Sequence, residues 1–127
     1  MGLRPSGHHA GTGHRQWAAR GDAAERVRAR ELQLRADITE AVYNLETAYR
    51  TAELQRANRE RAREELRLAQ ERFRLGAGTF LELLDSQALA SQAEVQYIEA
   101  VYAFHSALAA LEAAIGRPLA RERSEAR

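Results

Sequence analysis

The 127-residue sequence contains no cysteine, only two prolines, and few aromatic side chains, which make up 6% of the chain. The lack of cysteine excludes disulfides, thiolate metal sites and cysteine nucleophiles. The scarcity of aromatic residues argues against a wide core, because these side chains bury the largest areas. No stretch approaches the roughly 20 consecutive apolar residues of a membrane-spanning helix. The first 20 residues also lack the apolar run of a signal peptide.

Alanine and arginine dominate what is present. The chain has 26 Ala and 19 Arg, no Lys, and a formal net charge of +1. Alanine favours helices but buries little area per residue, so the sequence predicts helices more readily than a globule. Residues 75–115 contain no basic side chain and 5 acidic ones, and the Arg residues before them alternate with Glu. Without a dense basic stripe, no nucleic-acid partner is predicted.

The segment from Gly21 to Arg74 is expected to form one long helix. After Gly21 it contains neither Pro nor Gly and consists mostly of strong helix formers. Residues 1–20, rich in Gly, His and Arg, are expected to be an unstructured tail, and residues 117–127 a charged tail. The histidines of the first tail could bind a metal only weakly, so no metal or cofactor is predicted.

Heptad-like spacing along this helix predicts an apolar seam. Its first part consists of Ile38, Val42, Leu45, Tyr49 and Ala52. A polar interval follows at Arg56, Arg59 and Arg61, and the seam then resumes at Ala62, Leu66, Ala69 and Phe73. Such a gap is unfavourable in a self-sufficient two-stranded coiled coil. Because the Arg residues of 50–74 alternate with Glu, they are expected to lie on a solvent-exposed helix face.

A hairpin tip is predicted at residues 75–79, where glycines can close the first helix. Thr79 and Glu82 have the spacing of a capping box that starts a second helix. That helix is expected to run to Ile115, before Gly116 and Pro118. Its predicted seam consists of Leu84, Ala88, Val95, Ile98, Tyr102, Leu108, Leu111 and Ile115. The predicted fold is all-α: a long antiparallel hairpin of two helices over residues 21–116.

The sequence offers little for catalysis. It has no nucleophile elbow, no phosphate-binding glycine loop followed by Lys, and no pair of histidines at metal-binding spacing. Glu82 and Asp85 share one helix face, but at an exposed tip water would screen them. The chain is therefore not expected to be an enzyme.

Residues 71–87, Glu-Arg-Phe-Arg-Leu-Gly-Ala-Gly-Thr-Phe-Leu-Glu-Leu-Leu-Asp-Ser-Gln, resemble the tip signature of TolC-type outer-membrane efflux proteins. Residues 38–45 and 107–116 resemble flanking parts of the same repeat. The resemblance, which covers about residues 20–119, implies one hairpin of a trimeric α-helical tunnel in the periplasm. The tunnel would be a passive export duct for small molecules in a tripartite pump, located at the outer membrane and periplasm. We expect the chain to be the C-terminal repeat of such a channel, and to lack its membrane strands and secretion signal.

The resemblance also implies roles for the tip residues. Leu75, Gly76 and Ala77 would contact the periplasmic membrane-fusion adaptor, which links the channel to an inner-membrane pump. Glu82 and Asp85 would form acidic rings at the entrance, disfavouring anions. The remaining tip positions are Phe73, Arg74, Gly78 and Thr79.

Two of these positions depart from the family pattern, since Phe73 replaces a usual Tyr and Gly78 a residue that is charged in some members. The alternative interpretation is a soluble coiled-coil interaction module, such as the adaptor's own hairpin. That interpretation predicts flanking β-rich lipoyl halves, which the sequence does not indicate.

Overall fold

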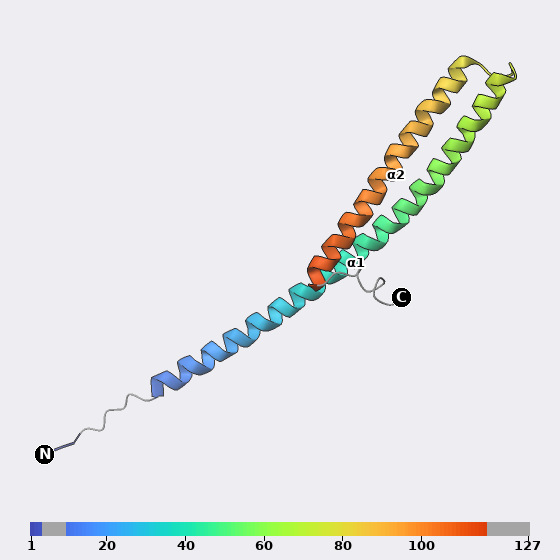
Figure 1. Ribbon diagram of the computed structural model, residues 1–127. Coiled ribbons are helices and arrows are strands. Elements are labelled where there is room, and N and C mark those ends of the chain that lie inside the picture. Colours follow the sequence, from blue (N-terminus) through green and yellow to red (C-terminus); the bar gives the residue numbers. More distant parts are fainter. Residues whose placement is uncertain (4–9, 117–127) are drawn as a thin grey trace, which may run out of the picture. The chain divides into compact units, whose positions relative to one another are not determined.

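The computed structural model describes residues 1–3 and 10–116, and its contacts divide the chain into two units, Met1–Asp37 and Ile38–Arg127. The two helices are α1, Ala10–Arg74, and α2, Phe80–Ile115. In the second unit, residues 38–74 of α1 and the whole of α2 run side by side in opposite directions (Figure 1). The predicted all-α helical hairpin is confirmed.

Helix α1 begins at Ala10, well before the expected start at Gly21. Glycine inside a helix costs only about 1 kcal/mol relative to Ala, and extending an existing helix avoids the cost of nucleation. Gly11 and Gly13 therefore do not stop it. In the unit Met1–Asp37, none of the described side chains is buried, and Trp17, Val27, Leu32 and Leu34 are exposed. The other residues expected to form tails, 4–9 and 117–127, lie outside the described residues.

The core of the hairpin is a narrow seam with alanine at alternate layers. On α1 the inward positions follow a heptad and are at least half-buried: Ile38, Ala41, Leu45, Ala48, Ala52, Gln55, Arg59, Ala62, Leu66 and Ala69. On α2 they are Leu83, Ser86, Ala90, Ala93, Tyr97, Ala100, Phe104, Ala107, Leu111 and Ala114. Ala41, Ala93, Ala100 and Leu111 are the buried core. Small side chains let the two backbones approach closely, and Tyr49 and Phe104 add an aromatic contact with ring centroids 6.0 Å apart.

The predicted seam is correct on much of α1 but wrong on most of α2. Ala41 and Ala48 take the places expected for Val42 and Tyr49, which are exposed. On α2 Leu111 lies inward as predicted, and Leu108 and Ile115 are half-buried beside the inward positions Ala107 and Ala114. Leu84, Ala88, Val95, Ile98 and Tyr102 lie on the exposed face, called here the outer stripe. Both faces of α2 are apolar, so spacing alone could not identify the buried one.

Helix α2 is also long and apolar enough, by length and composition, to cross a membrane, contrary to the expectation from uninterrupted apolar runs. The difference arises because the mean hydropathy of a stretch of 18 residues can stay high when scattered polar residues lie among alanines and larger apolar residues. Only 11% of the qualifying window is buried within the chain. One such helix is weak evidence for a membrane span, and the same exposure equally suits a helix that packs against other protein surfaces.

Candidate functional site

The candidate site is the tip of the hairpin, residues 71–86, where backbone hydrogen bonds fix the turn. The Gly76 N–H donates to the Phe73 carbonyl at 3.0 Å, and the Ala77 N–H to the Arg72 carbonyl at 2.8 Å. This pair of bonds is a Schellman motif, which requires a left-handed residue after the helix. Gly76 supplies it with φ of 74°. The tip predicted at residues 75–79 therefore coincides with a defined helix stop.

Gly78 is enclosed by the same turn. Its N–H also donates to the Arg72 carbonyl, and a Cβ placed on it would lie 3.2 Å from the Arg72 Cβ and 3.3 Å from both Glu82 Oε2 and Phe73 N. These distances are tighter than ordinary van der Waals contact, so a larger residue would push the neighbours apart. In this turn, glycine is favoured over the charged residue that the family pattern has there in some members.

The predicted capping box is confirmed. The Thr79 hydroxyl accepts a hydrogen bond from the Glu82 N–H, and the Glu82 carboxylate accepts one from the Thr79 N–H, both at 3.1 Å. Two amides without intrahelical partners are thereby satisfied at the start of α2. Glu82 has a structural role here in addition to any role at an entrance.

Replacement of Thr79 by Ala is expected to destabilise the hairpin by about 1 kcal/mol, because the cap hydroxyl is lost. Thermal unfolding followed by circular dichroism measures the change. Thr51→Ala, at an exposed position within α1, is the matched control and is expected to be neutral or slightly stabilising. Equal melting of Thr79→Ala and the unmodified chain would contradict a stabilising cap.

The tip presents an apolar surface. Phe73 packs against Phe80 with ring centroids 5.9 Å apart, yet both are exposed, as are Leu75 and Leu81. Phe73 and Leu75 were predicted as tip residues, whereas Phe80 and Leu81 were not. Two large apolar residues directly after a capping Thr, at a turn with no core around it, are the signal that could have identified them.

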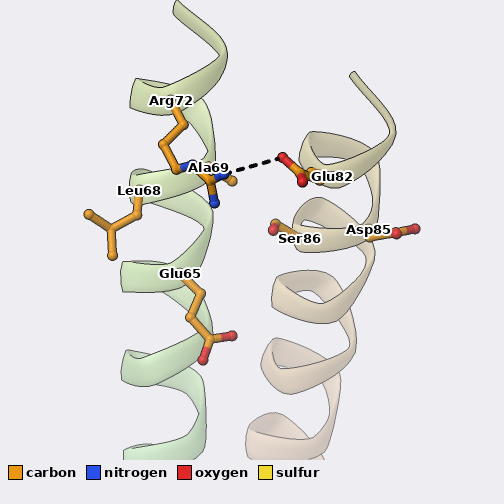
Figure 2. A pocket seen from close by; sticks show the side chains of 7 residues that line it. All are labelled: Glu65, Leu68, Ala69, Arg72, Glu82, Asp85 and Ser86. Carbon is orange, nitrogen blue, oxygen red and sulfur yellow. Dashed lines mark ion pairs between the residues drawn. The ribbon is translucent and has the colours of Figure 1, made fainter. Parts of the chain in front are cut away.

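A groove of about 440 Å³ lies between the two helices beside the tip. It is lined by Glu65, Leu68, Ala69, Arg72, Glu82, Asp85 and Ser86 (Figure 2). Arg72 and Glu82 reach toward each other across the helices, with Nη2 and Oε2 3.8 Å apart, while Asp85 points away from α1. Among the described residues, no ion pair or hydrogen bond is made by the Asp85 side chain, so its charge is uncompensated there. The groove thus carries an excess of negative charge.

Arg74, another predicted tip residue, is held by its own helix. Its Nε donates to Glu71 Oε2 at 3.1 Å, and this hydrogen bond raises the pKa of Arg74 and lowers the pKa of the Glu71 carboxyl below its usual value. The same arrangement one heptad earlier, between Arg67 and Glu64, lowers the pKa of Glu64. A lowered carboxyl pKa favours the folded chain above the unfolded-state pKa, and this contribution is lost as pH falls through the folded value.

Replacement of Arg74 by Gln is expected to raise the pKa of Glu71 toward its ordinary value, because the main hydrogen-bond donor is removed. NMR titration of the side-chain carboxyl carbons measures this directly. Glu64, which keeps Arg67, is the internal control and should not change. An unchanged Glu71 titration would show that Arg74 does not hold that carboxylate in solution.

The structure also reveals a polar cluster in the middle of the hairpin that the sequence did not predict. Arg59 faces α2 rather than away from the seam, with its guanidinium 3.9 Å from the centre of the Tyr97 ring. Glu94 lies 3.8 Å from Arg59 Nη1 and accepts a hydrogen bond from Arg63 Nη2 at 2.9 Å. Arg56 and Arg61 are exposed, as expected of the polar interval. The heptad that joins Ala52, Arg59 and Leu66 was the available signal.

Comparison with known proteins gives two matches to this chain. Residues 13–117 match the family described as outer membrane efflux protein. The alkaline protease secretion protein AprF of Pseudomonas aeruginosa is 36% identical over 95 residues, covering 75% of this chain and 20% of AprF. The chain thus spans about a fifth of the length of this curated relative. No solved structure matches significantly.

Proposed function

The chain belongs to the outer membrane efflux protein family, and we propose that its hairpin is one segment of the wall of a periplasmic export tunnel. In this proposal three copies of the full-length channel assemble around a water-filled lumen, as part of a tripartite pump at the outer membrane and periplasm. The family is one of channels rather than enzymes. The hairpin would have no catalytic role and would form part of the wall of a passive duct.

The observation that carries this proposal is the outer stripe of α2. Its large members are well exposed, with Leu84 at 44%, Val95 at 54%, Ile98 at 59% and Tyr102 at 75%. A largely apolar exposed face on a long helix, with Ser91 as a small polar position between Ala88 and Val95, indicates an interaction surface. A neighbouring hairpin in the tunnel wall would cover it along its whole length.

Charge supports a particular choice of neighbour. α2 carries only acidic charges, whereas residues 50–74 of α1 carry 8 Arg against 5 Glu and are net positive. Two α2 helices packed against each other would therefore repel, while α2 of one hairpin against α1 of the next would attract. Contacts of this head-to-tail kind form a closed ring when the rotation between neighbours closes, and a closed ring is the arrangement that a tunnel wall requires.

The tip would form the entrance of the tunnel. Leu75 and Ala77 are exposed beside Gly76 and would contact the membrane-fusion adaptor. Asp85, whose charge is uncompensated among the described residues, would contribute more to an acidic ring than Glu82, which is engaged in the capping box and lies near Arg72. Repeated by symmetry, such carboxylates would disfavour anions at the constriction.

The relative's name favours a second class of cargo beside small molecules. AprF is an alkaline protease secretion protein, so this chain's channel would pass a protein. The alternative of a soluble adaptor hairpin is less favoured, because the family match is to the outer membrane efflux proteins.

A chimera tests the proposal. The segment of AprF that matches this chain is replaced by the corresponding 95 residues of this chain, and alkaline protease is measured in the medium and in the cells. We expect secretion to be retained, because the hairpin supplies the same part of the wall. A chimera with Asp85→Asn is the matched comparison for the entrance. A chimera that reaches the outer membrane but retains protease inside the cell would contradict the proposed role.

A further inference from the structure

Helix α2 has two apolar faces, and in its middle part it buries the one with the smaller side chains. Between residues 90 and 102 the inward positions are Ala90, Ala93, Tyr97 and Ala100, whereas the outer stripe there includes Val95, Ile98 and Tyr102. Apolar burial is roughly proportional to area, so in this middle part α2 would gain area by turning the outer stripe toward α1, whereas Leu83, Phe104 and Leu111 favour the observed face elsewhere. In the middle part another interaction favours the observed face.

The cluster around Arg59 is the polar contact between the helices in this region. The Arg59 side chain is only 18% exposed and lies against Tyr97, and its neighbour Arg63 shares Glu94 with it. A cation over an aromatic face, together with an ion pair, compensates a charge that is largely removed from water. Glu60, on the same helix as Arg59, lies 3.1 Å from Arg59 Nη2, whereas Glu94 and Tyr97 compensate Arg59 only while positions 94 and 97 of α2 face it.

Rotation of α2 would remove this compensation. Successive residues of a helix are about 100° apart, so bringing Val95 and Ile98 inward would carry Glu94 and Tyr97 toward the flank. Arg59 would then face aliphatic side chains and keep only Glu60 of its own helix as an acidic partner among those it now has, so its compensation in the seam would be weaker. The observed face avoids this cost even though it buries smaller residues.

We propose that Arg59, acting through Glu94 and Tyr97, selects which face of α2 packs against α1 and so keeps the outer stripe exposed. The Nε of Arg59 is buried without a hydrogen-bond partner. This unpartnered Nε lowers the stability of the hairpin. Polar residues at seam positions of coiled coils likewise lower stability when they specify one packing arrangement. Only the use of the stripe by a neighbouring hairpin depends on the function proposed above.

Cysteine cross-linking in the full chain tests the selection, because the chain has no cysteine of its own. One pair, Ala62→Cys with Ala93→Cys, joins inward positions, and a second, Ala62→Cys with Val95→Cys, reports a rotated α2. Each pair is placed in the unmodified background and with Arg59→Leu. The ratio of inward to rotated cross-link within one chain is expected to fall about tenfold in Arg59→Leu, because a leucine tolerates both faces.

Arg56→Leu is the matched control: it makes the same change at an exposed arginine, paired on its own helix with Glu53 at 3.3 Å, and should leave the ratio unchanged. Arg59→Lys retains a charge for Glu94 but not the planar guanidinium, and should give an intermediate ratio. If Arg59→Leu loses its helical circular dichroism, and so does not fold, the cross-link ratio of Arg59→Lys becomes the test of the proposal. The proposal is overturned if the folded Arg59 variants give the same ratio of inward to rotated cross-link as the unmodified chain. It is also overturned if the unmodified chain forms the cross-link between positions 62 and 95, which reports a rotated α2. Cross-linked dimers bear instead on lateral packing between hairpins.

Discussion

Replacement of Ala100 by Glu is expected to separate the two helices of the hairpin. Ala100 is 6% exposed and sits where the backbones approach closely. A carboxylate there would be buried without a partner, a situation that costs roughly 3–5 kcal/mol in proteins. Much of the marginal stability of a small domain would be lost. Urea unfolding followed by circular dichroism measures the effect.

The matched control is Ala103→Glu, since Ala103 lies on the same helix with its side chain exposed. It introduces the same charge and helix propensity without burial, so its stability should change by less than about 0.5 kcal/mol. Equal destabilisation by the two substitutions would mean that the added acidic charge on α2, rather than burial at Ala100, causes the loss. Equal stability of both would contradict the close contact at Ala100.

Joint replacement of Val95 and Ile98 by Asp is expected to abolish association between hairpins while leaving each hairpin folded. Burial of one such aliphatic side chain contributes about 1.5–3 kcal/mol, so loss of two weakens association roughly 100-fold or more. The added charges also oppose packing. Analytical ultracentrifugation over a range of concentrations measures association, and circular dichroism verifies the fold.

The control for this pair is Gln96→Asp with Ala103→Asp. Both positions are exposed on α2 but lie off the outer stripe. The control adds the same charge and should retain association, reduced only by the screened electrostatic contribution. If both double variants associate as the unmodified chain does, the outer stripe is not the contact surface.

The parts of this structure that depend on neighbouring residues could be predicted from the sequence. The helix stop before Gly76 and the cap at Thr79 were identified correctly, because each motif is defined by residues within one turn of it. The start of α1 was misplaced, since the cost of two glycines is small against the length of helix that follows. Residues close in sequence therefore predict the tip of the hairpin correctly, but they do not predict where α1 begins.

The choice of buried face could not be predicted in the same way. Period and apolarity are similar on the two faces of α2, and the larger side chains of Val95 and Ile98 pointed to the wrong one. The contacts that select the buried face join Arg59 to residues on the other helix. Considered without those residues, an arginine is predicted to face solvent. Only the pairing of the two helices brings Arg59 and Tyr97 together.

The self-contained turn at the tip also bears on how the chain folds. All hydrogen bonds of the Schellman motif and the capping box join residues within 71–83, so this loop closes at a small entropic cost. Once Phe73 meets Phe80, each further pair of inward positions is the next turn along, and the pairing of Tyr49 with Phe104 comes late. We expect a zipper-like order of events that begins at the tip and runs toward the open end, with folding as rapid as in other helical proteins of local topology.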